Sequence, residues 1–382
     1  MKIDVNNSVP KYLQLKEIII RYFHEKQYDT DQKIPSETEL MAQFKVSRNT
    51  VRQALAELVN AGFIYKKHGS GSFFSGKTEK EESHSYLIGV ITPFISSYIY
   101  PQIIQGIDDV AHERRYNIVL GSSKGELAKE RNCLEQLLEK NIEGLLIEPA
   151  GGFQSIQESE TFNVVKTLGI PVVFMDWEID DPDISYVSLN DLEGGFRATS
   201  YLAQAGHTRI ACVYPDDHIP GIRRYEGYKK ALDTYQLAYN ESLVRATTIE
   251  KWNETSHIIA LTKNLLALGK QRPSAIFFFN DNAALRAYIA IREAGLRIPE
   301  DISIMGFDDS ELATLADAPL TTMIHPKYQL GKWAAEMLFD DMAHNDHRIP
   351  RQLLVNPTIV IRHSVKEIKS IRTLPEIPLL SS

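Results

Sequence analysis

The sequence contains very little cysteine and no long apolar run. Its 382 residues include only two cysteines, Cys133 and Cys212, which lie too far apart to form a metal-binding or redox motif. This scarcity excludes a disulfide-rich secreted scaffold, so we expect a reducing compartment. No apolar stretch reaches the roughly 20 residues that a membrane-spanning helix needs, and the first residues lack the apolar region of a signal peptide. We therefore expect a cytoplasmic protein without a membrane partner.

Sequence motifs for several kinds of chemistry are also missing. The chain has no Walker A motif for nucleotide phosphates, no HExxH zinc motif and no other cluster of Cys and His with metal-ligand spacing. We therefore expect no metal site and no cofactor. Positive charge is not in excess either, and a net charge of −8 argues against general affinity for nucleic acid.

The charge is distributed unevenly along the chain. Residues 1–80 carry 13 Lys and Arg against 9 Asp and Glu, whereas residues 81–382 carry 29 against 41. The polar stretch SGKTEKEESHS at 75–85 has no apolar periodicity, which is typical of an exposed linker. We predict a small basic module over 1–75, a linker over 76–85, a large acidic domain over 86–370 and a tail over 371–382.

Three helical patterns occupy the basic module. We predict helices over residues 10–26, 35–44 and 47–62. Ser36 and Glu39 have the spacing of a capping box, and Ser47 is the expected N-cap of the third helix. The apolar residues of that helix recur at helical spacing and predict a buried face, made of Val51, Ala54, Leu55, Leu58 and Val59.

The exposed side of the third helix is rich in hydrogen-bond donors. Its first turns present Arg48, Asn49, Arg52 and Gln53, with Thr50 beside the cap. Arginine can bind guanine or phosphate with two donors, and asparagine can pair with adenine. Two helices joined by a three-residue turn fit a helix-turn-helix motif that enters the major groove. Taken alone, this helix is described equally well as an ordinary solvated amphipathic helix.

The next residues favour the DNA-binding interpretation. The stretch FIYKKHGSGSFF at 63–74 has the pattern of a strand, a glycine turn and a second strand, with Lys66, Lys67 and His68 at its tip. A hairpin in this position converts a helix-turn-helix into a winged helix. Its basic tip can then reach the neighbouring groove or backbone.

Residues 33–74 resemble the DNA-binding domain of GntR-family transcriptional regulators over both helices, the turn and the wing. Two positions depart from the family pattern: DQK at 31–33 replaces a frequent glycine, and Ser72 replaces a frequent threonine. Neither removes a donor. The resemblance implies contacts with double-stranded operator DNA from Ser36, Glu37, Ser47, Arg48, Asn49, Thr50, Arg52, Lys67, His68 and Gly69.

The acidic domain alternates short apolar strands with amphipathic helices. Strands are predicted over residues 86–92, 116–122, 142–149, 170–176, 209–215, 274–280 and 302–308. Apolar strands separated by helices indicate parallel α/β sheets, and the length of the domain favours two lobes. The predicted fold class is α/β, with an N-terminal winged helix-turn-helix and a two-lobed domain.

Polar residues follow the predicted strands, where ligands bind in open parallel sheets. They are Ser97, Tyr98, Lys124, Glu148, Asp176, Asn280 and Asp308, to which Arg224 in GIRRYEGY is added. Each residue alone is more often a helix cap or a solvated loop residue. Together they predict an acceptor-rich cleft for a polyhydroxylated ligand, and its acidity disfavours sugar phosphates.

Three motifs carry a second resemblance. MGFDDSELATLADAPLTTMIHP at 305–326, RRYEGY at 223–228 and FFFNDNAAL at 277–285 resemble the effector domain of LacI/GalR regulators and periplasmic sugar-binding proteins. The resemblance implies a periplasmic-binding-protein-like fold and effector contacts from the cleft residues and His325. It also implies a first lobe over about 86–187 and 327–352 and a second over about 188–325 and 353–370. Trp252 aligns loosely with a ligand-covering aromatic residue.

A GntR-type head on a LacI-type body resembles the arabinose repressors of Gram-positive bacteria. This resemblance implies a homodimeric repressor that leaves its operator when a small unphosphorylated sugar binds, with L-arabinose as the first choice. The helix after His325 is expected to return to the first lobe, where family members dimerise. Another pentose, a hexose or a nucleoside is an alternative ligand.

A different class of function, an enzyme, fits one pattern. GSSKG at 121–125 matches the G-x-S-x-G elbow of serine hydrolases, and Ser123, Asp308 and His325 occur in the order of a triad. No glycine-rich oxyanion loop precedes it, and the last two residues already have a role in the predicted cleft. We therefore expect a regulator and no enzyme.

Overall fold

The computed structural model describes residues 10–26, 28–67, 70–76, 84–96, 98–151, 160–344 and 348–368. The chain forms two compact units, Met1–His84 and Ser85–Ser382. The positions of these units relative to each other are not determined. No helix in the described ranges combines the length and the apolar character needed to cross a bilayer.

The N-terminal unit is a three-helix domain with a hairpin, as predicted. Its elements are α1 (Lys11–Glu25), α2 (Glu37–Phe44), α3 (Arg48–Asn60), β1 (Ile64–Lys67) and the antiparallel β2 (Gly71–Phe74). Ser36 and Glu39 form the complete capping box, and Ser47 caps α3 by accepting a hydrogen bond from the Thr50 backbone N–H. The predicted buried face of α3 is confirmed except at Val59, which is half-buried.

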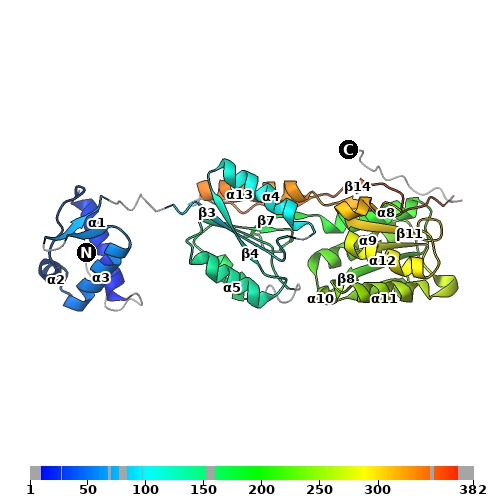
Figure 1. Cartoon of the computed structure of the whole chain (residues 1–382), viewed down its shortest axis with the longest axis horizontal. Helices are drawn as coiled ribbons and strands as arrows, with labels where there is room; N and C mark the ends of the chain where they lie inside the picture. The colour runs from blue at the N-terminus through cyan, green and yellow to red at the C-terminus, as the bar shows by residue number, and fades with distance from the viewer. Residues whose placement is uncertain are drawn as a thin grey trace. The chain divides into compact units, whose positions relative to one another are not determined.

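The first lobe of the larger unit contains a six-stranded parallel sheet. Its strand order is β13 (Gln352–Val355), β7 (Ser185–Leu189), β6 (Val172–Met175), β5 (Gly144–Ile147), β3 (Leu87–Thr92) and β4 (Asn117–Ser122). Helices α4 (Tyr100–Glu113) and α13 (Lys327–Ala343) cover one face, and α5 (Leu127–Leu138) covers the other (Figure 1). The short helix α7 (Glu160–Thr167) contacts α5. The helix after His325, α13, packs against α4 and against β5, β6 and β7 of this lobe.

The second lobe repeats this architecture with one reversed strand. Its strand order is β14 (Ile359–Val360), β12 (Thr321–Ile324), β11 (Ser303–Asp308), β10 (Ala275–Phe278), β8 (Ile210–Pro215) and β9 (Val244–Thr247), in which only β14 is antiparallel to its neighbour. Helices α8 (Asp191–Gln204) and α9 (Ile219–Thr234) lie on one face, and α11 (Thr255–Leu266) and α12 (Asp281–Glu293) lie on the other (Figure 1). Short helices fill the connections: α10 (Ile249–Trp252), η1 (Glu241–Leu243), η2 (Gly269–Gln271) and η3 (Glu311–Thr314).

The chain passes between the lobes after β7, between β12 and α13, and after β13. The predicted crossings near 187 and 352 fall inside β7 and β13, so both are corrected to the ends of these strands, at Leu189 and Val355. The physical reason is that β7 and β13 pair with each other up to Leu189 and Val355, so both strands belong to the sheet of the first lobe over their whole length.

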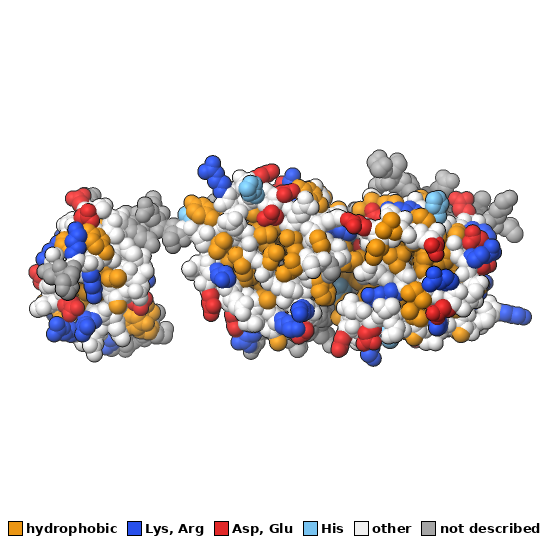
Figure 2. Space-filling view, viewed as in Figure 1, with side chains coloured by type: hydrophobic (Ala, Val, Ile, Leu, Met, Phe, Trp, Pro, Cys, Tyr) orange, Lys and Arg blue, Asp and Glu red, His pale blue; other side chains and the backbone are white. Residues whose placement is uncertain are grey.

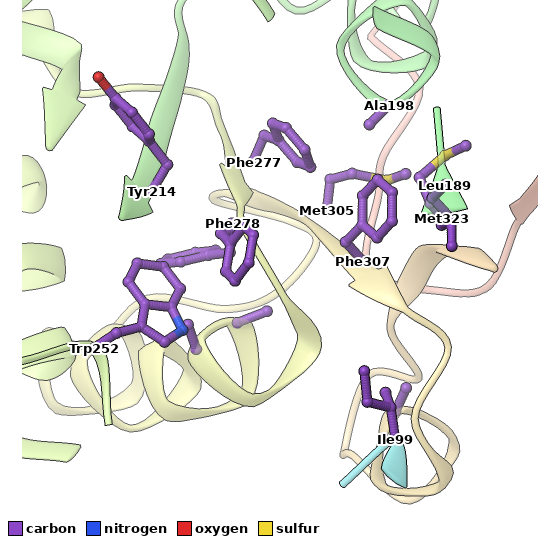
Figure 3. Packing of buried hydrophobic residues seen from close by; sticks show 14 of the residues in the cluster. Ile99, Leu189, Ala198, Tyr214, Trp252, Phe277, Phe278, Met305, Phe307 and Met323 are labelled. Carbon is purple, nitrogen blue, oxygen red and sulfur yellow. The ribbon is translucent and has the colours of Figure 1, made fainter. Parts of the chain in front are cut away.

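Buried strands carry apolar residues toward both faces of the second sheet. Phe277 and Phe278 are adjacent in β10 and point to opposite faces, whereas Met305 and Phe307 of β11 lie side by side (Figure 3). This alternation is the two-residue period of a strand. It explains why these strands appear in the sequence as continuous apolar runs.

Candidate functional site

The N-terminal unit places the predicted DNA-binding residues at the start of α3 and at the hairpin. The side chains of Arg48 and Arg52 are 73% and 67% exposed, and Asn49 is exposed beside them. Lys67, at the end of β1, lies over the rings of Tyr65 and Phe73. Figure 2 shows Lys and Arg side chains on the visible face of this unit. His68 and Gly69 lie outside the described residues.

Glu37 has a role that its sequence position did not reveal. One carboxylate oxygen lies 3.3 Å from Nε of Arg48, and the other lies 4.0 Å from Nε of Arg52. The carboxylate on α2 therefore lies beside both guanidinium groups of α3, in exposed and weak ion pairs. A pair of exposed arginines at a helix N-terminus is suited to bases and phosphates in a groove.

A cavity of about 1300 Å³ is lined by residues from both lobes of the larger unit. The effector residues predicted from the sequence lie around it, from Tyr98, Lys124, Glu148 and Asp176 of the first lobe to Arg224, Asn280, Asp308 and His325. Ser97 lies outside the described residues. These side chains come together because parallel strands place their carboxyl ends at one edge of each sheet.

Arg224 is the central cation of the cavity and is only 4% exposed. Its Nε donates to Asp191 at 2.7 Å, its Nη1 donates to the backbone oxygen of Phe279 at 2.6 Å, and the same Nη1 lies 3.5 Å from Asp308. The guanidinium also lies 3.5 Å from the ring centroid of Phe307. Burial raises the pKa of Asp191 to about 6, although the charge of Arg224 acts in the opposite direction.

The first lobe contributes two further carboxylates in different states. Burial, followed by the negative charge of Asp176, raises the pKa of Glu148 well above its usual range, and Tyr100 donates to Glu148 at 3.0 Å. Burial alone would also raise the pKa of Asp176, but His325, 3.1 Å away, acts together with Arg224 and His218 in the opposite direction, and the net effect lowers that pKa. The cavity therefore combines a carboxyl group that favours its proton with one that favours its charge.

Several cavity residues have a left-handed backbone although they are not glycine. The φ angles are 61° at Tyr98, 51° at Lys124, 53° at Asp176 and 102° at Asp308. Non-glycine residues adopt this region at a cost of roughly 1–2 kcal/mol each, so the surrounding structure must impose it. Such residues concentrate at functional sites, which supports a binding role for this edge of both sheets.

One wall of the cavity is aromatic. Trp252 is buried, and its indole N–H donates to the Asn280 side-chain oxygen at 3.3 Å. The same oxygen accepts the Ala283 backbone N–H and caps α12. Phe279 packs edge-on against Trp252 and against His218, in which burial, together with Arg224, lowers the pKa to about 4. A sugar ring needs such an apolar surface beside polar groups that bind its hydroxyls.

Comparison with known proteins gives two family matches. Residues 11–74 match the bacterial regulatory proteins of the gntR family, and residues 199–365 match the periplasmic binding protein-like domain. The predicted winged helix and the predicted effector-domain fold are both confirmed. A LacI family transcriptional regulator from Enterococcus faecium, solved with bound ribose, has a TM-score of 0.62 and 26% identity, covering 74% of this chain and 100% of that chain.

Two relatives are similar to this chain over more than nine tenths of their own length. An arabinose metabolism transcriptional repressor from Geobacillus stearothermophilus is 35% identical over 363 residues, which cover 94% of this chain and 99% of the relative. Another, from Halalkalibacterium halodurans, is 31% identical and covers 88% of this chain and 92% of the relative. The chain belongs to this family of transcriptional repressors.

The geometry of this gntR-type repressor uses the three residues of the hydrolase alternative differently. Ser123 is buried, and its hydroxyl oxygen accepts the Gly125 backbone N–H at 3.3 Å. His325 pairs with Asp176, while the Asp308 carboxylate faces Tyr98 and Arg224. The relatives are repressors and not enzymes. In the described parts of the chain, no cluster of His, Cys, Asp or Glu is arranged to hold a metal ion.

Sequence reasoning missed several residues that shape the repressor's cavity. Asp191 follows β7, a strand that was not predicted, and Tyr100 begins a helix instead of ending a strand. Asp281, by contrast, stands beside Asn280 among the polar residues that end the predicted strands. It is fully buried and accepts hydrogen bonds from the Thr322 hydroxyl at 2.6 Å and the Ser310 backbone N–H at 2.7 Å.

Proposed function

We propose that this repressor binds operator DNA through its winged helices and leaves it when an unphosphorylated sugar, L-arabinose by preference, occupies the cavity between the lobes. The regulated genes would be those of sugar use, and the protein would act in the cytoplasm, where its operator lies. The single observation that carries the proposal is the cluster of buried carboxylates around Arg224 in the cavity.

The charge of the cavity supports a neutral, hydroxyl-rich ligand. Glu148, Asp176 and Asp308 supply acceptors for sugar hydroxyls, and Arg224 supplies donors to ring or hydroxyl oxygens. A phosphate group placed beside Asp176, the carboxyl group that favours its charge, would experience repulsion in a low-dielectric environment. The names of the full-length relatives, which regulate arabinose metabolism, support L-arabinose as the first sugar to test.

Exposed apolar residues support a homodimer. Leu120 is 37% exposed on β4, at the end of the sheet of the first lobe. Figure 2 shows hydrophobic side chains gathered on the visible face of the first lobe. Grouped exposed apolar side chains are typical of interfaces. A two-fold dimer would match a palindromic operator with two half-sites.

The ligand proposal is tested by thermal shift of the full chain against L-arabinose, other pentoses, hexoses, nucleosides and sugar phosphates. At a ligand concentration 100 times the dissociation constant, binding to the native state adds about 2.7 kcal/mol to the free energy of unfolding. The apparent unfolding temperature rises as a result. We expect a shift with L-arabinose and none with its phosphate. A shift produced only by phosphorylated sugars would contradict the proposal.

A further inference from the structure

A hydrogen bond joins the two lobes across the cavity. The hydroxyl of Tyr98, from the connection between β3 and α4, donates to Oδ2 of Asp308 at the end of β11. The other oxygen of Asp308 lies 3.5 Å from Nη1 of Arg224. The two carboxylate oxygens thus each face a protein donor, and the Asp308 side chain is only 6% exposed. Asp308 also lines the cavity, so a sugar hydroxyl that takes the Oδ2 position must displace the Tyr98 hydroxyl or share the oxygen with it.

The two donors differ in how firmly they are fixed. Arg224 lies within α9, donates to Asp191 and to the Phe279 backbone, and stacks on the ring of Phe307. Tyr98 lies in a connection outside helix and strand and adopts a φ of 61°. Its phenol is therefore the neighbour of Asp308 that can be exchanged, because its departure breaks one side-chain hydrogen bond and disturbs no helix or strand.

We infer that Tyr98 competes with the effector for Asp308 and so sets the affinity of the repressor for its sugar. This inference rests on the proposed function, and it replaces the direct ligand contact that the sequence predicts for Tyr98. In the free protein the phenol hydroxyl occupies the acceptor that a sugar hydroxyl takes in the complex. Sugar binding then exchanges one hydrogen bond to the Asp308 carboxylate for another. The binding free energy gained is therefore smaller than if the acceptor were vacant in the free protein.

Removing the phenol hydroxyl should strengthen sugar binding if Tyr98 competes with the sugar and weaken it if Tyr98 contacts the sugar. In Tyr98→Phe the buried carboxylate of the free protein lacks this donor, while the complex is unaffected, so L-arabinose should bind more tightly. We expect a decrease in the dissociation constant on the order of tenfold, the size of one hydrogen bond to a charged acceptor. The association rate should rise and the dissociation rate should stay unchanged, because the competitor acts only on the free state.

The experiment is calorimetry and stopped-flow binding of L-arabinose to the full chain. Tyr98→Phe is compared with wild type and with Tyr328→Phe, which removes a phenol hydrogen bond of 2.8 Å to Asp109 on an exposed site outside the cavity. Tyr98→Leu, which also lacks the hydroxyl, is the second variant should Tyr98→Phe fail to fold. Asp308→Asn tests the acceptor itself.

Tighter and faster binding by the Tyr98 variants, with Tyr328→Phe equal to wild type, supports the inference. Weaker or unchanged binding by the Tyr98 variants overturns it and leaves the proposed function intact. Failure of the wild type to bind L-arabinose overturns both. If Asp308→Asn binds L-arabinose with wild-type affinity, Asp308 is not the acceptor for the sugar, and the inference is overturned as well.

Discussion

Arg224 illustrates how single residues combine structure and recognition in this repressor. Its guanidinium is almost fully buried, so its charge must be compensated, and Asp191 and Asp308 provide that compensation. Arg224 is fixed in place by these partners and by the Phe307 ring. A fixed, planar donor of this kind can orient a sugar before any hydroxyl reaches the carboxylates.

Arg48→Ala should weaken operator binding by ~1–3 kcal/mol, because the exposed guanidinium would contact a base or a fixed phosphate. Fluorescence anisotropy with a labelled operator measures the loss, and calorimetry should give unchanged sugar affinity. Arg131→Ala, in the exposed ion pair with Glu135 on α5, is the matched control. Operator affinity equal to wild type in Arg48→Ala would remove this residue from the DNA-binding surface.

At the scale of elements, α8 and α9 approach each other closely at glycines. A Cβ atom added at Gly227 would lie 2.1 Å from the Leu192 backbone oxygen and 2.5 Å from the Phe196 backbone nitrogen. A Cβ atom added at Gly195 would likewise lie 2.0 Å from the Arg224 backbone oxygen. Because Arg224 lies in this contact, the packing of the two helices also determines the position of the cavity's central cation.

Gly227→Ala should destabilise the larger unit by about 1–3 kcal/mol, as expected when a core without free space receives a methyl group. It should also weaken sugar binding, since α9 must shift. Urea unfolding and calorimetry measure the two effects. Gly169→Ala serves as control because the added carbon has no described atom within 4 Å. Equal stability of both variants would show that α8 and α9 are less tightly packed.

Glu130 links α5 to the segment after β5, which carries Glu148. Its carboxylate accepts the Ala150 backbone N–H, and burial raises its pKa to about 7, although that hydrogen bond acts in the opposite direction. The unfolded chain loses this proton near pH 4.3, so the native state binds more protons between there and about pH 7. Stability from this group therefore falls as the pH rises through that window.

Glu130→Gln keeps an acceptor for Ala150 but has no charge to bury. It should be more stable than wild type by roughly 1–3 kcal/mol at pH 8, and this advantage should disappear by about pH 4. Urea unfolding at both pH values tests the expectation. If the stability difference between Glu130→Gln and wild type does not change with pH, ionisation of Glu130 does not destabilise the native state.

Much of the fold follows from local patterns in the sequence. The helix caps at Ser36 and Ser47 and the buried strands β8, β10 and β11 were predictable because each is specified by neighbouring residues. Five short strands were not predicted, because their formation depends on pairing partners distant in sequence: β7, β9, β12, β13 and β14.

The candidate site was also only partly predictable from the sequence. The rule that ligands bind at the carboxyl ends of parallel strands placed Glu148, Asp176 and Asp308 at one cavity. It could not predict the pairs Asp176–His325 or Tyr98–Asp308, each of which joins residues more than 100 positions apart. Their pairing depends on how the two lobes face each other, and local periodicity does not encode that.

Across the whole molecule, positive and negative charge are concentrated in different units. The basic residues gather in the unit that is to meet phosphates, and the acidic excess lies in the unit that surrounds the cavity. A sugar can change operator affinity only through its different affinities for the lobe arrangements that permit and prevent DNA binding. The cavity is lined from both lobes, so an occupant would contact both and could favour one arrangement.

Release by sugar is tested most directly by operator binding of the full chain, measured by fluorescence anisotropy during a titration with L-arabinose. We expect the sugar to lower operator affinity in wild type, by at least tenfold at saturation if the coupling is ~1.4 kcal/mol or more. Asp308→Asn should bind the operator normally and respond weakly or not at all. Operator affinity that no unphosphorylated sugar changes, in a chain that binds DNA, would contradict the account.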